Sequence, residues 1–276
     1  MKTQKILVLG ATGKTGRRVA TRLEKLNYQV RKGSRQEDPS FDWDDSTTWP
    51  GALQDMDAVY ITFQPDLAVP GALETIKAFS TAMVSAGIQK VVLLSGRGET
   101  EAERCEQVIM DSGLDWTIVR ASWFNQNFSE SFFLDSILAG HVALPKNDAL
   151  VPYIDADDIA DVVVEVLLKA EHSGKIYELT GPQQFTFEQV MQKISQAAER
   201  EVKFEPIPLE AYISGMKEAG VPEDYVWLIG YLFTEILTEE NAVITNDVEH
   251  VLGRKPKDFE TYARETAATG VWDSNR

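Results

Sequence analysis

The chain has 276 residues, with 27 Lys and Arg against 43 Asp and Glu, a formal net charge of −16. This acidic excess opposes binding to nucleic acid or to an anionic membrane surface, because Lys and Arg must neutralise such partners. No apolar run approaches the ~20 residues of a membrane span. Because the first expected strand begins close to residue 1, we expect no signal peptide, and the single cysteine, Cys105, excludes an internal disulfide. We expect a cytoplasmic protein, monomer or homodimer, with a small-molecule substrate.

Apolar runs and helical periodicities alternate through the first part of the chain. We expect strands at 4–9, 28–33, 58–63, 90–95 and 115–120, and helices at 14–26, 46–54, 70–86 and 101–112. This alternation is typical of a parallel, doubly wound Rossmann-type sheet, whose ligands lie beyond the carboxyl ends of the strands. The fold class is therefore α/β. The segments that follow these strands are small or polar, as a cofactor site requires.

Three glycines occupy the turn between the first strand and the first helix. Residues 6–16 read Ile-Leu-Val-Leu-Gly-Ala-Thr-Gly-Lys-Thr-Gly, with Gly10, Gly13 and Gly16 three residues apart. Such a turn suits a dinucleotide pyrophosphate, because glycine allows a sharp bend and close approach, and the helix start supplies N–H groups. A P-loop would need a glycine at position 8, which is Val8. A turn that uses glycine for its geometry alone is the alternative.

The end of the second expected strand favours NADP(H) over NAD(H). Residues 31–35 read Arg-Lys-Gly-Ser-Arg, and the first acid beyond them is Glu37. A carboxylate there would bind the ribose hydroxyls of NAD, whereas Ser34 and Arg35 can bind a 2′-phosphate. Residues 1–35 also hold ten of the basic residues and one acid. The alternative is a solvated basic turn.

The pattern changes after Arg120, where an aromatic and amide-rich segment follows the last strand of the alternating part. Further on we expect a strand at 150–154, a helix after Asp155, a strand at 177–180, a capping box at Thr186 and Gln189, helical structure at 208–238 and a last helix opened by Pro256. We divide the chain into an NAD(P)-binding domain, 1–122, and a C-terminal substrate-binding part, 123–276, packed on it, some of whose segments return to the sheet.

The sequence resembles the NmrA-like branch of the atypical short-chain dehydrogenase/reductases over almost its whole length. The matching motifs are 10–16, 94–96, 112–120, 123–127, 153–160 and 177–182. Gly33-Ser34-Arg35 followed by 40–43 is similar to the festuclavine-dehydrogenase-like group, which lies near the NAD(P)H quinone reductase-like proteins. These motifs are specific for fold and cofactor and poorly specific for substrate.

The resemblance implies a set of cofactor-binding residues. It assigns the pyrophosphate to the Gly10 turn with Thr12, Gly13, Lys14, Thr15 and Gly16, the 2′-phosphate to Ser34 and Arg35, the adenine to Asp42 and Trp43, the ribose and nicotinamide to Thr62, Phe63 and Gln64, and the nicotinamide side to Ser95 and Gly96. Trp43 has a second interpretation as a core aromatic.

Candidate substrate-binding residues are Arg97, Trp123, Phe124, Asn127 and Tyr153. Three of them have a structural alternative: Arg97 can pair with Glu99 or Glu101, Asn127 can shape its loop, and Tyr153 can pack at a strand end. The three histidines, His141, His172 and His250, lack metal-ligand spacing, so we expect no metal site.

Main-family short-chain reductases use a Tyr with a Lys four residues later as a proton-donating pair, and the segment after Ser95 contains none. We expect no such pair anywhere in the chain and leave the catalytic residues unassigned. The expected function is NADPH-dependent hydride transfer to a small conjugated substrate of quinone, azo or imine type. The alternative is a non-catalytic NADP(H)-sensing regulator. A sugar-nucleotide epimerase is disfavoured by the missing pair.

Overall fold

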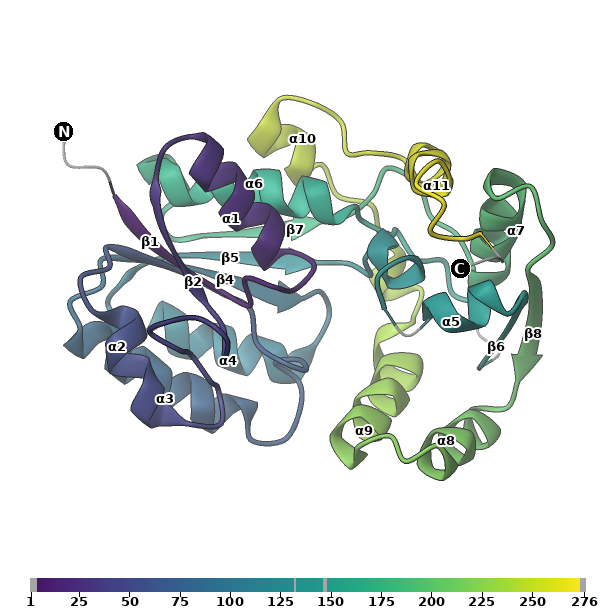
Figure 1. The fold of residues 1–276 in the computed structure, drawn as a ribbon, viewed down its shortest axis with the longest axis horizontal. Helices are drawn as coiled ribbons and strands as arrows, with labels where there is room; N and C mark the ends of the chain where they lie inside the picture. Colours follow the sequence, from purple (N-terminus) through teal and green to yellow (C-terminus); the bar gives the residue numbers. More distant parts are fainter. Residues whose placement is uncertain (1–3, 132, 146–147, 274–276) are drawn as a thin grey trace. The chain divides into compact units, whose positions relative to one another are not determined.

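Six strands form one parallel sheet in the order β2-β1-β3-β4-β5-β7 (Figure 1). They are β1 (Lys5–Leu9), β2 (Gln29–Gly33), β3 (Ala58–Ile61), β4 (Lys90–Gly96), β5 (Asp115–Ala121) and β7 (Lys175–Leu179). All of β3 and all but the first residue of β1 are buried, as expected for a parallel sheet that is covered on both faces. The predicted α/β class with a Rossmann-type sheet is confirmed.

Helices cover both faces of this sheet (Figure 1). One layer holds α1 (Gly16–Lys25), α6 (Ala156–Leu168) and α10 (Asp247–Leu252), and the other holds α2 (Trp49–Leu53), α3 (Ala72–Ser85) and α4 (Thr100–Met110). The five strands and three helices predicted up to residue 120 agree with these bounds to within two residues at either end. The predicted helix at 46–54 is a 3₁₀ turn, Ser46–Thr48, followed by α2.

The computed structural model describes residues 4–131, 133–145 and 148–273, and its chain divides into two units. Unit 1 contains 1–121, 156–179 and 247–253, and unit 2 contains 122–155, 180–246 and 254–276. The sheet and its helices therefore belong to unit 1, which includes two segments far along the chain. Within the described residues no helix is both long and apolar enough to span a bilayer.

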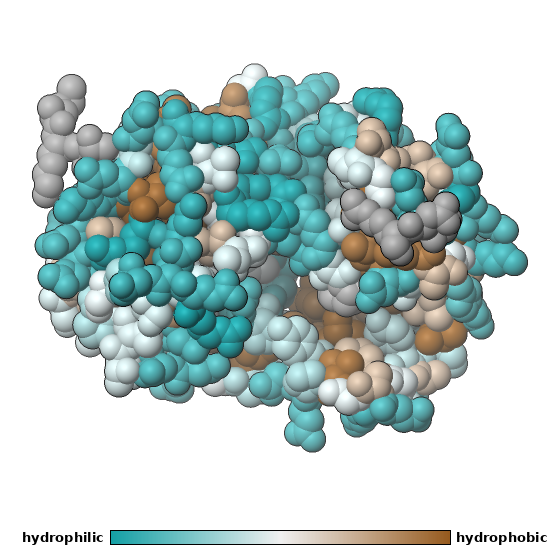
Figure 2. Space-filling model, in the orientation of Figure 1, coloured by the Kyte–Doolittle hydropathy of each residue, from teal (hydrophilic) through white to brown (hydrophobic). Residues whose placement is uncertain are grey.

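Unit 2 contains several short helices and one pair of parallel strands. Its elements are η2 (Asn125–Phe128), α5 (Phe133–Leu138), β6 (His141–Pro145), α7 (Phe187–Ala197), β8 (Lys203–Ile207), α8 (Leu209–Glu218), α9 (Glu223–Tyr231), the π-helix Leu232–Ile236, the 3₁₀ turn Glu240–Ala242 and α11 (Phe259–Ala267). Apolar residues show at the surface over α8 and α9 (Figure 2), and α8 has no fully buried residue.

Some expectations for the second half of the chain are wrong. Residues 150–154 are not a strand and make only isolated bridges from Val151 and Ile154, since Pro152 between them has no N–H to donate. The helix at 208–238 is broken at 219–222, which contains Gly220 and Pro222. The last helix begins after Asp258, whose carboxylate accepts the Thr261 N–H, rather than at Pro256. The capping box at Thr186 is confirmed.

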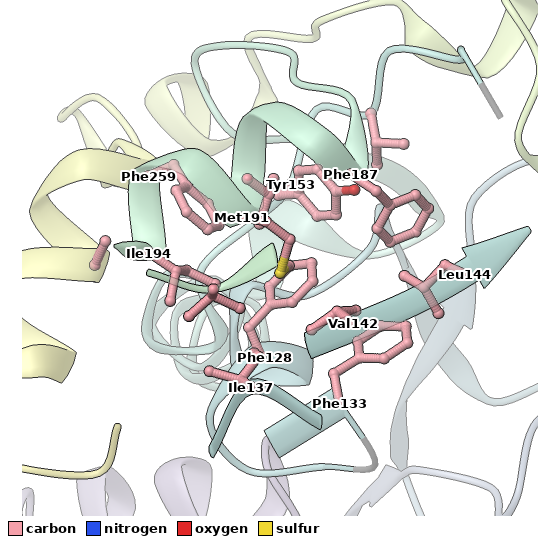
Figure 3. Packing of buried hydrophobic residues seen from close by; sticks show 14 of the residues in the cluster. Phe128, Phe133, Ile137, Val142, Leu144, Tyr153, Phe187, Met191, Ile194 and Phe259 are labelled. Atoms are coloured by element: carbon pink, nitrogen blue, oxygen red, sulfur yellow. The ribbon is translucent and has the colours of Figure 1, made fainter. Parts of the chain in front are cut away.

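An aromatic cluster forms the core of unit 2 (Figure 3). Phe128, Phe187 and Phe259 are each at most 2% exposed, and Phe128 and Phe133 stack with ring centroids 5.4 Å apart. Trp272, near the end of the chain, donates its indole N–H to the Phe128 carbonyl at 2.8 Å. Trp272 therefore packs into the same core as the segment that follows β5.

Candidate functional site

The glycine turn lies where the strand order reverses. β1 is hydrogen-bonded to β2 on one side and to β3 on the other, and ligands bind at such a switch point. Gly10 has φ +61°, and a Cβ there would lie 2.2 Å from Thr62 Oγ1 at the end of β3. A Cβ on Gly16 would lie 2.2 Å from the Gly10 carbonyl oxygen, and one on Gly13 would lie 3.9 Å from Gln64 Nε2. The end of β3 therefore excludes a side chain at Gly10, and the backbone of the turn itself excludes one at Gly16.

The start of α1 has the properties of an anion-binding site. Its first turn contains no acidic residue, and the Thr15 hydroxyl does not cap the helix because it accepts a hydrogen bond from the Tyr60 hydroxyl at 3.0 Å. Burial raises the pKa of Tyr60, so this phenol stays a neutral donor. Thr15 is buried and Thr12 is exposed. Of the two threonine side chains, only that of Thr12 is therefore placed to meet a ligand.

Arg35 follows β2 in a closed loop. The Ser34 carbonyl accepts the Phe41 N–H at 2.9 Å, and the Ser34 hydroxyl accepts the Gln36 N–H at 3.3 Å. Arg35 is exposed and makes no hydrogen bond or ion pair with any residue that the structure describes. Its guanidinium therefore presents its donors to solvent, beside the Ser34 hydroxyl.

Other basic residues of the N-terminal segment are used inside unit 1. Arg22 binds Asp157 at 2.7 Å and Asp161 at 2.6 Å, both on α6. Arg31 donates to three carbonyls of residues 51–54 at 2.7–3.1 Å, at the end of α2. The charge excess counted along the sequence is therefore partly neutralised by tertiary contacts, whereas Arg35 is not.

Trp43 packs beside the end of β3. Its indole N–H donates to the Thr62 carbonyl at 3.2 Å, and its ring centroid is 4.9 Å from that of Phe63 and 5.0 Å from that of Phe79. It is only partly buried. The Asp42 carboxylate accepts the Asp44 N–H at 3.1 Å, which fixes the turn that carries Trp43. Trp43 is thus both a core aromatic and a neighbour of the switch point.

The contacts of Arg97, which follows β4, differ from those expected from the sequence. Arg97 pairs with Glu178 of β7 at 2.9 Å, not with Glu99 or Glu101, and its side chain is only 9% exposed. The Ser95 hydroxyl is buried without a hydrogen-bond partner in the described residues, and the Glu99 carboxyl lies against Gly96. Glu99 was considered above only as an ion-pair partner. Its position three residues after the end of a strand was the sequence signal that could have placed Glu99 near the site.

Four candidate substrate residues lie in unit 2. The Trp123 ring packs edge-on against Phe187 at 5.5 Å, and the Asn127 N–H donates to the Phe124 carbonyl at 3.1 Å. Tyr153 lies inside the aromatic core (Figure 3), 2% exposed, and its hydroxyl has no partner among the described residues. Burial raises the pKa of Tyr153, which makes it a weak proton donor. Trp123, Phe124 and Asn127 remain partly exposed.

One residue of this segment was not anticipated. Asn125 is fully buried, and neither its amide nitrogen nor its amide oxygen has a partner among the residues described. The amide-rich composition of residues 121–128 was the only sequence signal for it.

The expectation that the chain has no Tyr with a Lys four residues later is wrong, because Tyr28 and Lys32 have this spacing. Lys32 lies in β2, where its ammonium pairs with Glu24 at 3.0 Å, and Tyr28 immediately precedes that strand. Over a strand, four residues span about 13 Å, against about 6 Å on a helix. This spacing therefore does not create a hydrogen-bonded acid pair.

Two of the three histidines and the cysteine have structural environments. His172 is buried and its Nδ1 lies 2.6 Å from the Tyr177 hydroxyl, while His141 pairs with Glu205 at the surface. No group of three potential metal ligands occurs among the described residues. Cys105 is buried with its thiol 3.7 Å from the Leu67 carbonyl oxygen.

Comparisons with known proteins agree with this geometry. A family model described as NAD(P)H-binding matches residues 10–170. An NAD(P)H azoreductase of Xenophilus azovorans is 29% identical over 95% of this chain and 98% of its own. Prestalk A differentiation protein A of Dictyostelium discoideum is also 29% identical, over 95% and 92%, and festuclavine synthase I of Penicillium roqueforti is 26% identical, over 94% and 96%.

Solved structures share the fold. An NADPH-dependent quinone oxidoreductase of Escherichia coli, complexed with NADPH, superposes with a TM-score of 0.77 over 94% of this chain and 99% of that one, at 20% identity. The family match covers more than half of the chain and includes the glycine turn, Ser34 and Arg35. The resemblance inferred from the sequence motifs is confirmed, and this chain belongs to the NAD(P)H-binding family.

Proposed function

We propose that this protein is an NADPH-dependent reductase that transfers hydride to a small conjugated acceptor of the quinone, azo or iminium type. The observation that carries the cofactor half of this proposal is the exposed, unpartnered Arg35 beside Ser34 at the end of β2. A planar guanidinium binds a phosphate through two parallel hydrogen bonds, and no carboxylate lies nearer along the chain than Glu37 to repel it.

The glycine turn provides the other half of the cofactor site. The tight contact of Gly10 with Thr62 brings the turn against the end of β3, that of Gly16 brings α1 against the turn, and the start of α1 supplies N–H groups and a favourable dipole to a pyrophosphate. Thr12, Gly13 and Lys14 would hold that group. Thr62, Phe63, Gln64, Ser95 and Gly96, which follow β3 or end β4, would border the ribose and nicotinamide, with Asp42 and Trp43 towards the adenine. The bound cofactor supplies the hydride.

The acceptor class rests on what the chain lacks and on its relatives. The one Tyr and Lys with the spacing of a reductase acid pair are at β2, where Lys32 binds Glu24. An azoreductase and a festuclavine synthase are among the relatives. Trp123, Phe124 and Asn127 are the candidates to contact the acceptor, because they are partly exposed, whereas Arg97 and Tyr153 are occupied or buried.

The test is the consumption of NADPH, followed by its absorbance, with a panel of quinones, azo dyes and cyclic iminium ions. Turnover of at least one class with NADPH, and slower turnover with NADH, is the expected result. Failure of every class despite measurable NADPH binding would refute the reductase proposal.

A second candidate is a regulator that binds NADP(H) without turnover. The 29% identity to a differentiation protein over nearly the whole chain favours it. The same panel separates the two functions: a regulator would bind NADPH, reduce no acceptor and change its assembly state between NADP and NADPH. Size-exclusion chromatography with light scattering, in each cofactor, measures that change.

A further inference from the structure

Two carboxyl groups meet at the carboxyl edge of the unit 1 sheet. Asp66 lies in the segment that follows β3, and Glu99 precedes the first residue of α4, three residues after β4 ends. β3 and β4 are adjacent parallel strands, so both segments leave the same edge. The Asp66 and Glu99 side chains are hydrogen-bonded to each other, which requires that one of them keeps its proton.

The proton belongs to Glu99. The Asp66 carboxylate also accepts the Ala68 N–H at 2.8 Å, and this bond stabilises its charge. Burial, then the charge of Asp66, raises the pKa of Glu99 well above its ordinary value; burial raises that of Asp66 as well. Glu99 is 5% exposed, and its neutral form avoids an unpaired buried charge.

No cation of the described residues neutralises Glu99. The buried Glu106 raises the pKa of Glu99 further and is itself paired with Arg120 at 2.7 Å. Arg104 is directed to Glu101 at 2.7 Å on the exposed face of α4. The Cys105 thiol on the same helix has its pKa raised to about 12 by burial and is neutral.

The Glu99 carboxyl lies at the end of β4. A Cβ on Gly96 would lie 2.1 Å from Cδ and from Oε1 of Glu99, so the carboxyl fills the space that a side chain at Gly96 would take. Glu99 Oε2 is buried with no hydrogen-bond partner among the described residues, and so is Ser95 Oγ, whose residue is 5% exposed. A bound molecule that reaches this strand end could satisfy both atoms, and buried polar atoms are rarely left unpaired.

We propose that Glu99 donates the proton which a neutral acceptor takes up together with hydride, and that Asp66 is the positioning residue that keeps Glu99 hydrogen-bonded at the end of β4. This rests on the proposed reductase function. A quinone takes up one hydride from the reduced cofactor and one proton to form a hydroquinone. The Glu99 O–H bond breaks as the new O–H bond forms, and the carboxylate regains a proton from water.

The chemistry of the acceptor tests the proposal. A cationic acceptor, such as a triarylmethyl cation or an iminium ion, becomes neutral by taking up hydride alone. Glu99→Gln keeps the shape and a donor to Asp66 but has no acid proton. We expect it to slow quinone turnover about 100-fold or more and that of the cation about twofold or less. Glu101→Gln, which removes an exposed carboxylate two residues away, is the matched control and should change neither.

The pH dependence of turnover is a second test, which uses a second variant, Asp66→Asn. Turnover of the quinone by the wild-type protein should fall as the pH rises through the pKa of Glu99, because Glu99 then loses its proton. Turnover of the cation should show no such decrease. Asp66→Asn removes a charge that raises the pKa of Glu99, so the decrease in quinone turnover should occur at lower pH. If quinone turnover of Asp66→Asn falls at the same pH as that of the wild type, the role of Asp66 is overturned.

The remaining outcomes are distinguishable. Equal loss with both acceptors in Glu99→Gln, or no loss with either, overturns the assignment of Glu99, since a purely structural carboxyl would not separate the acceptors. Wild-type protein that reduces the cation but no neutral acceptor also overturns it. Wild-type protein that binds NADPH and reduces neither class refutes the proposed function itself.

Discussion

Replacing Arg35 with alanine tests the cofactor assignment most directly. Arg35 is exposed, so its removal breaks no hydrogen bond or ion pair within the residues that the structure describes. We predict that the wild-type protein binds NADPH at least about tenfold tighter than NADH, and that Arg35→Ala removes most of this preference. Affinity for NADH, which lacks the 2′-phosphate, should hardly change.

The magnitude follows from the exposure of the side chain. Hydrogen bonds to charged groups contribute about 1.5–3 kcal/mol. Because Arg35 lies at the surface, its contact with a phosphate stays partly in water, and the lower end of that range applies. A difference of about 1.4 kcal/mol is tenfold in the dissociation constant. The preference should also shrink with added salt, since the Debye length falls from about 10 Å at 0.1 M to about 3 Å at 1 M.

Isothermal titration calorimetry with NADPH and NADH measures both affinities for each variant. Lys25→Ala, which removes one positive charge in the last turn of α1, away from the glycine turn, is the control for net charge. Equal wild-type affinities for the two cofactors, or an equal loss of both in Arg35→Ala, would refute the reasoning.

Three further predictions concern stability and reactivity. Gly16→Ala should destabilise the fold by about 1–3 kcal/mol, because its Cβ would lie 2.2 Å from the Gly10 carbonyl oxygen. Gly215→Ala in α8, with open space around it, should stabilise the fold by about 0.5–1 kcal/mol. Urea unfolding of both variants measures these changes, and equal effects of the two substitutions would contradict the prediction. Tyr153→Phe should not lower stability or turnover, because the hydroxyl it deletes has no partner in the described residues; a large loss of turnover would make Tyr153 part of the site. The Cys105 thiol, whose pKa burial raises to about 12, should resist thiol reagents even at pH 9 until the protein is unfolded by urea, and rapid labelling of folded protein would contradict its burial.

The strands of unit 1 and the glycine turn could be predicted because their signals are local. An apolar run of strand length, a glycine where the backbone takes a positive φ, and a helical stripe such as Ile159, Val162 and Val166 are readable within a few residues. The stripe of the first helix shows the limit of this reasoning. Leu26 is in register with Val19 and Leu23 yet is 54% exposed, because α1 ends at Lys25.

The ion-pair partners of the charged residues could not be predicted from the local sequence in the same way. Arg22 meets acids more than 130 residues away on α6, and Arg97 meets Glu178 rather than the nearby Glu99 or Glu101. β6 and β8 were missed because they pair only with each other, about 60 residues apart, and carry weak alternation. Partners at such separations are set by topology, not by spacing along the chain.

The amino-acid sequence alone therefore determined the sheet, the cofactor turn and the basic end of β2, because short-range backbone geometry and side-chain periodicity specify them. Only the tertiary structure decided which polar groups stay available. It neutralised Arg22 and Arg97, buried Tyr153, left Arg35 in solvent and joined Asp66 to Glu99. The free energy of a charged or hydrogen-bonding group depends on its desolvation and its partners, and adjacent parallel strands bring those partners together from distant parts of the chain.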